Sequence, residues 1–119
     1  MTVKIEPAYY ADVVYIARNM RQADRDEIYP HLFKPTPEDL AAMSHGQQFC
    51  YAAFKDSIPV AAWGANERLP KVWQCWMFAT DQWPDVALSV TKSIRRDFST
   101  EIAKTGAVRL DCWSADGHD

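Results

Sequence analysis

One amphipathic segment in the second half of the sequence constrains the fold more than any other feature. Pro84 and Asp85 favour the first turn of a helix, and Gly106 favours its end. Between them, apolar residues recur every three or four positions, at Ala87, Val90, Ile94, Phe98 and Ile102. This spacing predicts a long helix with one buried face. Strand-like patterns at 72–80 and 107–113 flank it, so the helix crosses over between two strands that we expect to run parallel.

The rest of the chain predicts an antiparallel sheet preceded by helices. Residues 48–54, 58–66 and 72–80 are rich in aromatic and β-branched residues, and short polar turns separate them. The earlier elements are a strand and three helices, at 2–5, 7–20, 22–29 and 36–45. The resulting order, β-α-α-α-β-β-β-α-β, predicts an α+β fold whose mixed, mostly antiparallel sheet is flanked by helices.

The composition is that of one globular domain and excludes several partners. The chain has 119 residues, 48% of them hydrophobic, which predicts a single domain over 1–119. A net charge of −3 is a poor match for a phosphate backbone, so we expect no general nucleic-acid binding. No apolar run is long enough to cross a bilayer. Cys50, Cys75 and Cys112 are odd in number and widely spaced, which predicts no disulfide framework and a reducing cytoplasm. Cys75 falls within a predicted strand, where a cysteine is expected to be buried and inert; it would be a nucleophile only beside a histidine.

Five tryptophans are an unusual number for this length. Most of them lie on or beside the central strands, and Trp73 and Trp76 fall within one strand. Because side chains alternate along a strand, these two are expected on opposite faces of the sheet. We expect one face to be core and the other to line an aromatic groove.

The element order resembles the GNAT fold of acyl-CoA N-acyltransferases. The stretches that carry the resemblance are the opening 4–17, the hairpin 51–64 and the strand-to-helix passage 78–94. The resemblance implies acetyl transfer from acetyl-CoA to a small-molecule or protein amine. It also implies that a final helix and the last strands are lacking, so the domain is expected to be C-terminally incomplete. An exposed sheet edge there would favour a homo-oligomer or another partner.

The resemblance implies a coenzyme-binding loop between the strand predicted at 72–80 and the long helix. In the family this loop has the form Q/R-x-x-G-x-G/A, and its backbone amides hold the pyrophosphate at a helix N-terminus. Gln82 matches the first position and Ala87 the last, whereas Asp85 replaces the middle glycine. The coenzyme-binding residues predicted on this basis are Phe78, Ala79, Thr80, Gln82, Val86, Ala87 and Lys92.

Asp85 leaves two interpretations open. A carboxylate about 4 Å from a pyrophosphate charge is repelled by roughly 4 kcal/mol at an effective dielectric constant near 20. Coenzyme binding is then weakened, unless Asp85 points away and Lys92 or Arg96 compensates. Alternatively, Asp85 is an ordinary acid in a first helical turn, where the helix dipole favours it.

The sequence contains no decisive catalytic pattern. Acyl transfer to an ammonium needs a base, and the acids near the predicted site are Asp81, Glu67 and Asp111. Each is also typical of a turn or a surface position. The histidines His31, His45 and His118 fall on different elements, so we predict no metal site.

A narrower resemblance covers the aromatic passage 73–83 and the basic helix after it. It is similar to GNAT-like internal virion proteins of short-tailed phages, which also lack the glycine loop. Two hypotheses therefore stand. The chain is an acyl-CoA-dependent N-acetyltransferase with an altered loop, or it is a non-catalytic phage or prophage protein that keeps the GNAT shape.

Overall fold

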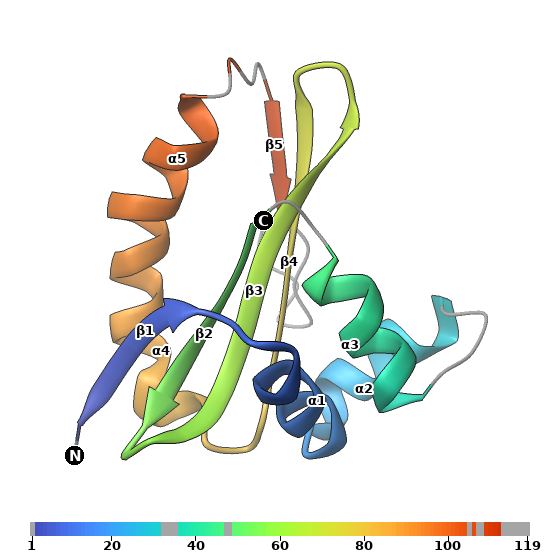
Figure 1. Cartoon of the computed structure of the whole chain (residues 1–119), viewed down its shortest axis with the longest axis vertical. Helices are drawn as coiled ribbons and strands as arrows, with labels where there is room; N and C mark the ends of the chain where they lie inside the picture. The colour runs from blue at the N-terminus through green and yellow to red at the C-terminus, as the bar shows by residue number, and fades with distance from the viewer. Residues whose placement is uncertain (1, 32–35, 47–48, 105, 107–108, 113–119) are drawn as a thin grey trace.

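The computed structural model describes residues 2–31, 36–46, 49–104, 106 and 109–112 (Figure 1). Its strands are β1 (Val3–Pro7), β2 (Phe49–Lys55), β3 (Ile58–Leu69), β4 (Val72–Ala79) and β5 (Arg109–Cys112). Its helices are α1 (Tyr10–Arg18), α2 (Gln22–Ile28), the short 3-10 turn η1 (Tyr29–His31), α3 (Pro37–His45), α4 (Trp83–Ser93), the π-helical turn η2 (Ile94–Phe98) and α5 (Ser99–Ala103). The predicted α+β order is confirmed.

The five strands form one sheet in the order β1-β2-β3-β4-β5. The first four are antiparallel neighbours, and β5 runs parallel to β4, as the crossover helix predicts. The β2–β3 connection is a two-residue turn in which Asp56 and Ser57 have φ of 50° and 71°. Positive φ at both central residues matches the right-handed twist of a hairpin. Short polar residues occupy this turn without glycine.

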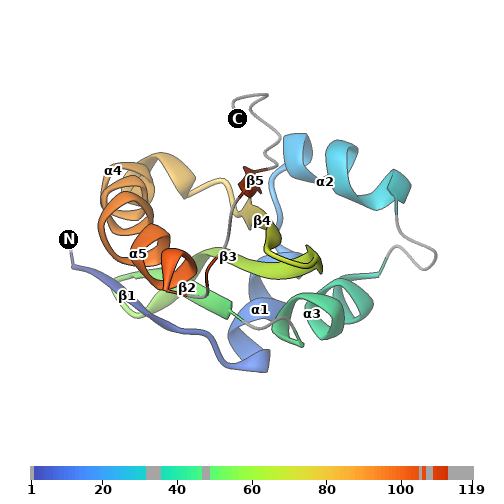
Figure 2. The same ribbon diagram turned by 90° about the horizontal axis from the view of Figure 1, so that it is seen from above.

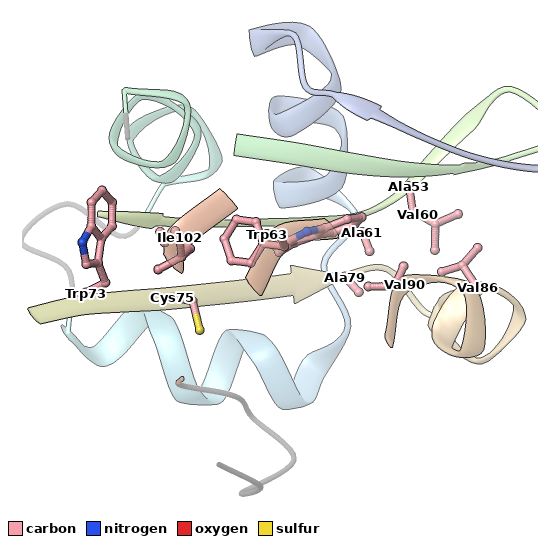
Figure 3. Close-up of a cluster of buried hydrophobic side chains, with 12 residues drawn as sticks. Ala53, Val60, Ala61, Trp63, Trp73, Cys75, Ala79, Val86, Val90 and Ile102 are labelled. Atoms are coloured by element: carbon pink, nitrogen blue, oxygen red, sulfur yellow. The ribbon is translucent and has the colours of Figure 1, made fainter. Parts of the chain in front are cut away.

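Helices cover both faces of the sheet, as Figure 2 shows from above. The segment α4–η2–α5 packs its buried Val86, Val90, Phe98 and Ile102 on one face, against Ala53, Val60, Ala61 and Trp63 (Figure 3). Helices α1 and α3 pack Val13, Ile16, Ala17, Leu40 and Ala41 on the other face, against Ala52, Ala62 and Phe78. Adjacent alanines on β2 and β3 thus point to opposite layers, and their small size lets both helical layers approach the sheet.

The long predicted helix is one continuous helical segment with a change of pitch. The α-helical turns of α4 pass into a π-helical turn at Ile94–Phe98 and then into α5. The apolar positions 90, 94, 98 and 102 are spaced by four throughout, so periodicity alone does not reveal the wider turn. Phe98 nevertheless remains buried at 3% exposure.

Trp73 and Trp76 point to opposite faces of the sheet, as predicted. The expected aromatic groove on one of those faces is wrong, because helices cover both. Trp73 is 1% exposed in the layer under α5. Trp76 packs into the layer of α1 and α3, stacked on Phe78 with ring centroids 5.6 Å apart. Trp113 lies outside the described residues. The tryptophans serve mainly to fill two cores.

Two structural features bear on where the chain resides: the length of its helices and the bonding of Cys75. In the described part of the chain, no helix is long and apolar enough to span a membrane. Cys75 is buried at 8% exposure, as expected, but the expectation of no disulfide is wrong, because Cys75 is disulfide-bonded. Its backbone lies opposite Cys112 in the parallel β4–β5 register, a relationship that sequence spacing does not reveal. The expectation of a reducing cytoplasm therefore loses its main support.

Candidate functional site

The candidate site lies where β4 ends and α4 begins. The antiparallel ladder between β3 and β4 continues to the pair Ala61–Ala79. On the other side, β5 pairs with β4 only from Val72 to Cys75. Beyond that point the described part of β5 offers no partner to the last half of β4. This half-paired strand is the place where the sequence predicts a bound coenzyme.

The backbone and side chains at the start of α2 form hydrogen bonds with the end of β4. The Ala79 N–H donates to Asp24 Oδ2 at 2.8 Å, and the Ala79 carbonyl accepts from the Arg21 N–H at 2.8 Å. Met20 and Thr80 form an antiparallel bridge beside these bonds. The segment 20–24 thus pairs with the last residues of β4 almost as an added strand would. Both main-chain groups of Ala79 are thus bonded within the chain.

Asp24 is fully buried and carries this contact. Its Oδ2 also accepts from Arg21 Nε at 2.8 Å, so one carboxylate oxygen holds both a backbone amide and a guanidinium. The side chain of Arg21 is 14% exposed, and its guanidinium lies 5.7 Å from the Trp83 ring centroid. Asp24 Oδ1 is buried with no hydrogen-bond partner in the described structure. Ion pairs this deeply buried cost desolvation energy and are costly to break.

The first turn of α4 has its amides bonded within the loop. The Gln82 N–H donates to Thr80 Oγ1 at 3.2 Å, and the Trp83 N–H donates to the Thr80 carbonyl at 3.1 Å. The Asp85 N–H donates to the Gln82 carbonyl at 3.0 Å. Pro84 has no N–H. A helix N-terminus holds an anion through amides that lack an internal acceptor, and this first turn has acceptors for its own.

Asp85 does not stand unpaired at the helix start. Its carboxylate lies 2.6 Å from Lys55 Nζ, and the same ammonium donates to Gln82 Oε1 at 3.2 Å. Lys55 comes from the end of β2, so it ties the β2–β3 hairpin to the start of α4. The sequence interpretation of Asp85 as a first-turn acid is consistent with its place in α4. The ion pair to Lys55 is a further feature, which only the fold creates.

The seven residues predicted to hold a coenzyme lie in three different environments. Phe78 is buried toward α1 and α3, whereas Ala79 and Val86 are buried between the sheet and α4. Thr80 is buried at 6% exposure, Ala87 is half-buried, and Gln82 is exposed. Lys92 is exposed and lies ten residues after Gln82, or roughly 15 Å along the helix at 1.5 Å per residue. Of these seven, only Thr80 and Gln82 have polar side chains at the loop.

The three acids considered as bases do not share a site. Asp81 is exposed at a hollow of about 210 Å³ that Tyr15 and Asn19 also line. Glu67 lies near the end of β3, opposite Trp73 at the start of β4, and its carboxylate accepts from the Lys71 N–H at 2.8 Å. Asp81 and Glu67 are thus separated by on the order of 25 Å of strand.

Asp111 is on β5, opposite Gln74 in backbone register. Among the described residues, no group of His, Cys, Asp and Glu side chains could hold a metal ion.

Sequence reasoning missed the buried pair Arg21–Asp24 and the ion pair Lys55–Asp85. The first lies in a segment that the sequence marks only as highly charged. Its i, i+3 spacing is the sole local signal. The second joins residues 30 positions apart. The periodicity of the sequence predicts neither of these two pairs.

No protein-family model matches this chain, and no curated protein does. Solved structures match its fold at low sequence identity. PaiA N-acetyltransferase from Thermoplasma acidophilum, in complex with coenzyme A, has 14% identity and a TM-score of 0.63, over 96% of this chain and 80% of its own. A putative GNAT-family acetyltransferase from Xanthomonas campestris pv. campestris has 14% identity and a TM-score of 0.61, over 99% and 79%.

Aminoglycoside N-acetyltransferase AAC(6')-Iy, in complex with coenzyme A, has 10% identity and a TM-score of 0.56, over 95% of this chain and 77% of its own. These likenesses establish a GNAT-like α+β fold.

Proposed function

We propose that this chain uses the GNAT-like fold as a binding or structural scaffold and does not hold acyl-coenzyme A at the start of α4. The observation that carries the proposal is the bonding of the α4 loop amides. Those of Gln82, Trp83 and Asp85 all donate within residues 80–85. A pyrophosphate placed there would have to displace these bonds before gaining its own. It would also compete with Asp85 for Lys55.

The end of β4 supports the same proposal. A ligand that paired with the Ala79 backbone would have to displace the Asp24 carboxylate from that amide. Displacement would leave Asp24 and the largely buried Arg21 guanidinium in a desolvated site with one contact fewer. Breaking such an arrangement costs several kcal/mol. The fold therefore favours its own α1–α2 connection over a coenzyme at this position.

Acetyl-CoA-dependent transfer to an amine is the second candidate. It is favoured by the Lys55–Asp85 pair, because an ammonium 2.6 Å from the carboxylate reduces the repulsion between Asp85 and a phosphate. The solved structures of similar fold include two complexes with coenzyme A. In this case the Lys55 ammonium would pair with a coenzyme phosphate as well as with the Asp85 carboxylate.

Thermal denaturation with acetyl-CoA separates the two candidates. A ligand at 100 times its Kd adds about 2.7 kcal/mol of stability, which is on the order of 10 °C in a domain of this size. We expect no shift at millimolar acetyl-CoA. A concentration-dependent shift, together with release of free coenzyme A in the presence of an amine, would overturn the scaffold proposal and establish the enzyme.

The variant Asp85→Gly sharpens this test, because it supplies the glycine of the family loop. On the scaffold proposal, Asp85→Gly still shows no shift, since the amides of Gln82 and Trp83 keep their internal acceptors. On the enzyme proposal, its shift exceeds that of the original chain.

The narrower sequence resemblance makes a virion component of a phage or prophage the first form of scaffold to test. Neighbouring genes that encode capsid or tail proteins would support it. A gene neighbourhood without them, combined with measured acetyl transfer, would contradict it.

A further inference from the structure

The last described strand, β5, lies at one edge of the sheet, beside β4 (Figure 2). Its pairing with β4 is parallel and covers only four residue pairs, from Val72–Arg109 to Cys75–Cys112. Among the described elements, β4 is the only one with which β5 makes extensive contact. Parallel pairs are slightly less stable than antiparallel ones, and a pair this short is marginal. Backbone pairing alone therefore holds β5 loosely.

The bonding of the cysteines points to a second restraint on β5. Cys75 is disulfide-bonded, whereas Cys50 is a free thiol. The third cysteine of the chain is Cys112, and its backbone lies directly opposite Cys75 at the last described pair of the β4–β5 ladder. A bond between these two positions closes a loop of 37 positions that contains α4, η2 and α5. Closing a long loop strongly restricts the chain.

We propose that Cys75 is bonded to Cys112, and that this bond is a redox latch which holds β5 on β4 in the oxidised chain and releases it in the reduced chain. A dithiol reductant breaks the S–S bond, each cysteine sulfur gains a hydrogen atom, and the reductant closes to its own disulfide. The latch does not depend on the scaffold proposal, because it involves neither the β4–α4 junction nor a coenzyme.

The described cores of the protein do not rely on β5, so its release is local. The residues that fill the two layers come from β2, β3, β4 and the helices, for example Val60 with Val90 on one face and Ala62 with Ile16 on the other. These contacts persist when β5 leaves. Weakly held edge elements also open locally without global unfolding. Such opening gives a reductant access to Cys75, which is only 8% exposed in the closed state.

Release of β5 changes what the edge of the sheet presents. In the oxidised chain, β5 covers the β4 edge from Val72 to Cys75. Without β5, the backbone groups of these residues lose their partners. Unpaired strand edges are the surfaces to which extended segments of other chains add. The redox state of Cys75 therefore determines whether this edge is covered.

Peptide mapping tests the pairing of the cysteines. With free thiols blocked first, tryptic digestion of the oxidised chain is expected to give the peptides 72–92 and 110–119 joined by a disulfide. Dithiothreitol should separate them. A bond between Cys75 and Cys50, or two unjoined peptides from the oxidised chain, would overturn the proposal.

Hydrogen exchange measured by NMR tests the release of β5. Dithiothreitol is expected to speed exchange of the protected β5 amides at least tenfold, while amides of the β2–β3 ladder around Ala52 and Ala62 keep their rates. Replacing the reductant with glutathione disulfide should restore protection, because two cysteine thiols then re-form the bond and two glutathione thiols are released. Unchanged β5 exchange would overturn the latch. Equal loss of protection in β2–β3 would also overturn it, since the bond would then hold the whole fold.

Cysteine variants separate the latch from a general effect of reductant. Cys112→Ser is expected to show fast β5 exchange without any reductant and no further change when dithiothreitol is added. Cys50→Ser removes the free thiol and is expected to behave as the original chain in both states. If Cys112→Ser fails to fold, the comparison of the oxidised and reduced original chain still decides the outcome. A response to dithiothreitol in Cys112→Ser equal to that of the original chain would contradict the proposal.

Discussion

The carboxylate of Asp24, fully buried at the start of α2, accepts a hydrogen bond of 2.8 Å from the backbone N–H of Ala79, the last residue of β4. Arg21 completes the contact from both its backbone and its side chain. This arrangement joins the helical layer of α1 and α3 to the free end of β4. It also fills the strand edge at which the sequence predicts a bound coenzyme.

Replacing Asp24 with Asn tests how strongly this contact holds the fold. Asn keeps an acceptor for the Ala79 N–H but removes the charge that pairs with Arg21. Breaking a buried pair from one side typically costs about 3–5 kcal/mol, so we expect a loss of this size in the free energy of unfolding, measured by urea denaturation. Asp26→Asn on the same helix removes an exposed charge and should change it by less than about 0.5 kcal/mol. Equal effects of the two variants would show that the buried pair adds nothing.

Gly64 is predicted to be required for space. It lies opposite Trp76 in the β3–β4 register, and a β-carbon there would lie 2.6 Å from the Trp76 ring and would clash with the Phe49 carbonyl. Overpacking a core costs about 1–3 kcal/mol, and a backbone clash adds to this. Gly64→Ala should therefore lower the thermal midpoint by on the order of 10 °C.

Gly46→Ala is the control for that experiment. Its β-carbon would lie 3.2 Å from the Ala42 carbonyl oxygen and 3.7 Å from that of Met43, and its φ of −76° suits any residue. We expect a change below about 1 kcal/mol in the free energy of unfolding. If Gly64→Ala is no more damaging than Gly46→Ala, the close approach of Trp76 to β3 is wrong.

The Lys55–Asp85 pair is predicted to contribute little to stability. The two side chains are 28% and 41% exposed, so solvent screens their attraction despite the 2.6 Å distance. A double-mutant cycle with Lys55→Gln and Asp85→Asn should give a coupling energy of no more than about 1 kcal/mol. A coupling of several kcal/mol would mean that the pair is a structural element of the hairpin–helix contact, comparable to Arg21–Asp24.

Cys50 is predicted to react slowly with alkylating reagents. Burial raises the pKa of its thiol to about 11. Only the thiolate reacts, so at pH 8 roughly one thiol in a thousand is reactive. The iodoacetamide rate should keep rising with pH up to about 11, with Cys50→Ser as the control for other cysteines. Because the pKa is raised on folding from 9.0, stability should fall as pH rises from about 9 to about 11. A plateau in rate near pH 9 would contradict the burial of this thiol.

The fold could largely be read from local patterns. The four-residue spacing from Val90 to Ile102 identifies the crossover helix, and the polar turn at Asp56-Ser57 identifies the hairpin. Such patterns involve residues that are close in sequence, so they can be recognised without the tertiary structure. They also place Trp73 and Trp76 on opposite faces. They do not reveal that the helices pack closely against both aromatic faces, which is why the predicted groove is wrong.

The sequence by itself determined the order of the elements, the parallel crossover and the acidic residue Asp85 at the start of the crossover helix. Only the tertiary structure decided which groups the residues of that loop contact. Asp24 meets Ala79 across 55 positions of the chain, and Lys55 meets Asp85 across 30. Such contacts depend on strand register and on how helices pack on the sheet. Since these are set by the whole core at once, no local pattern encodes them.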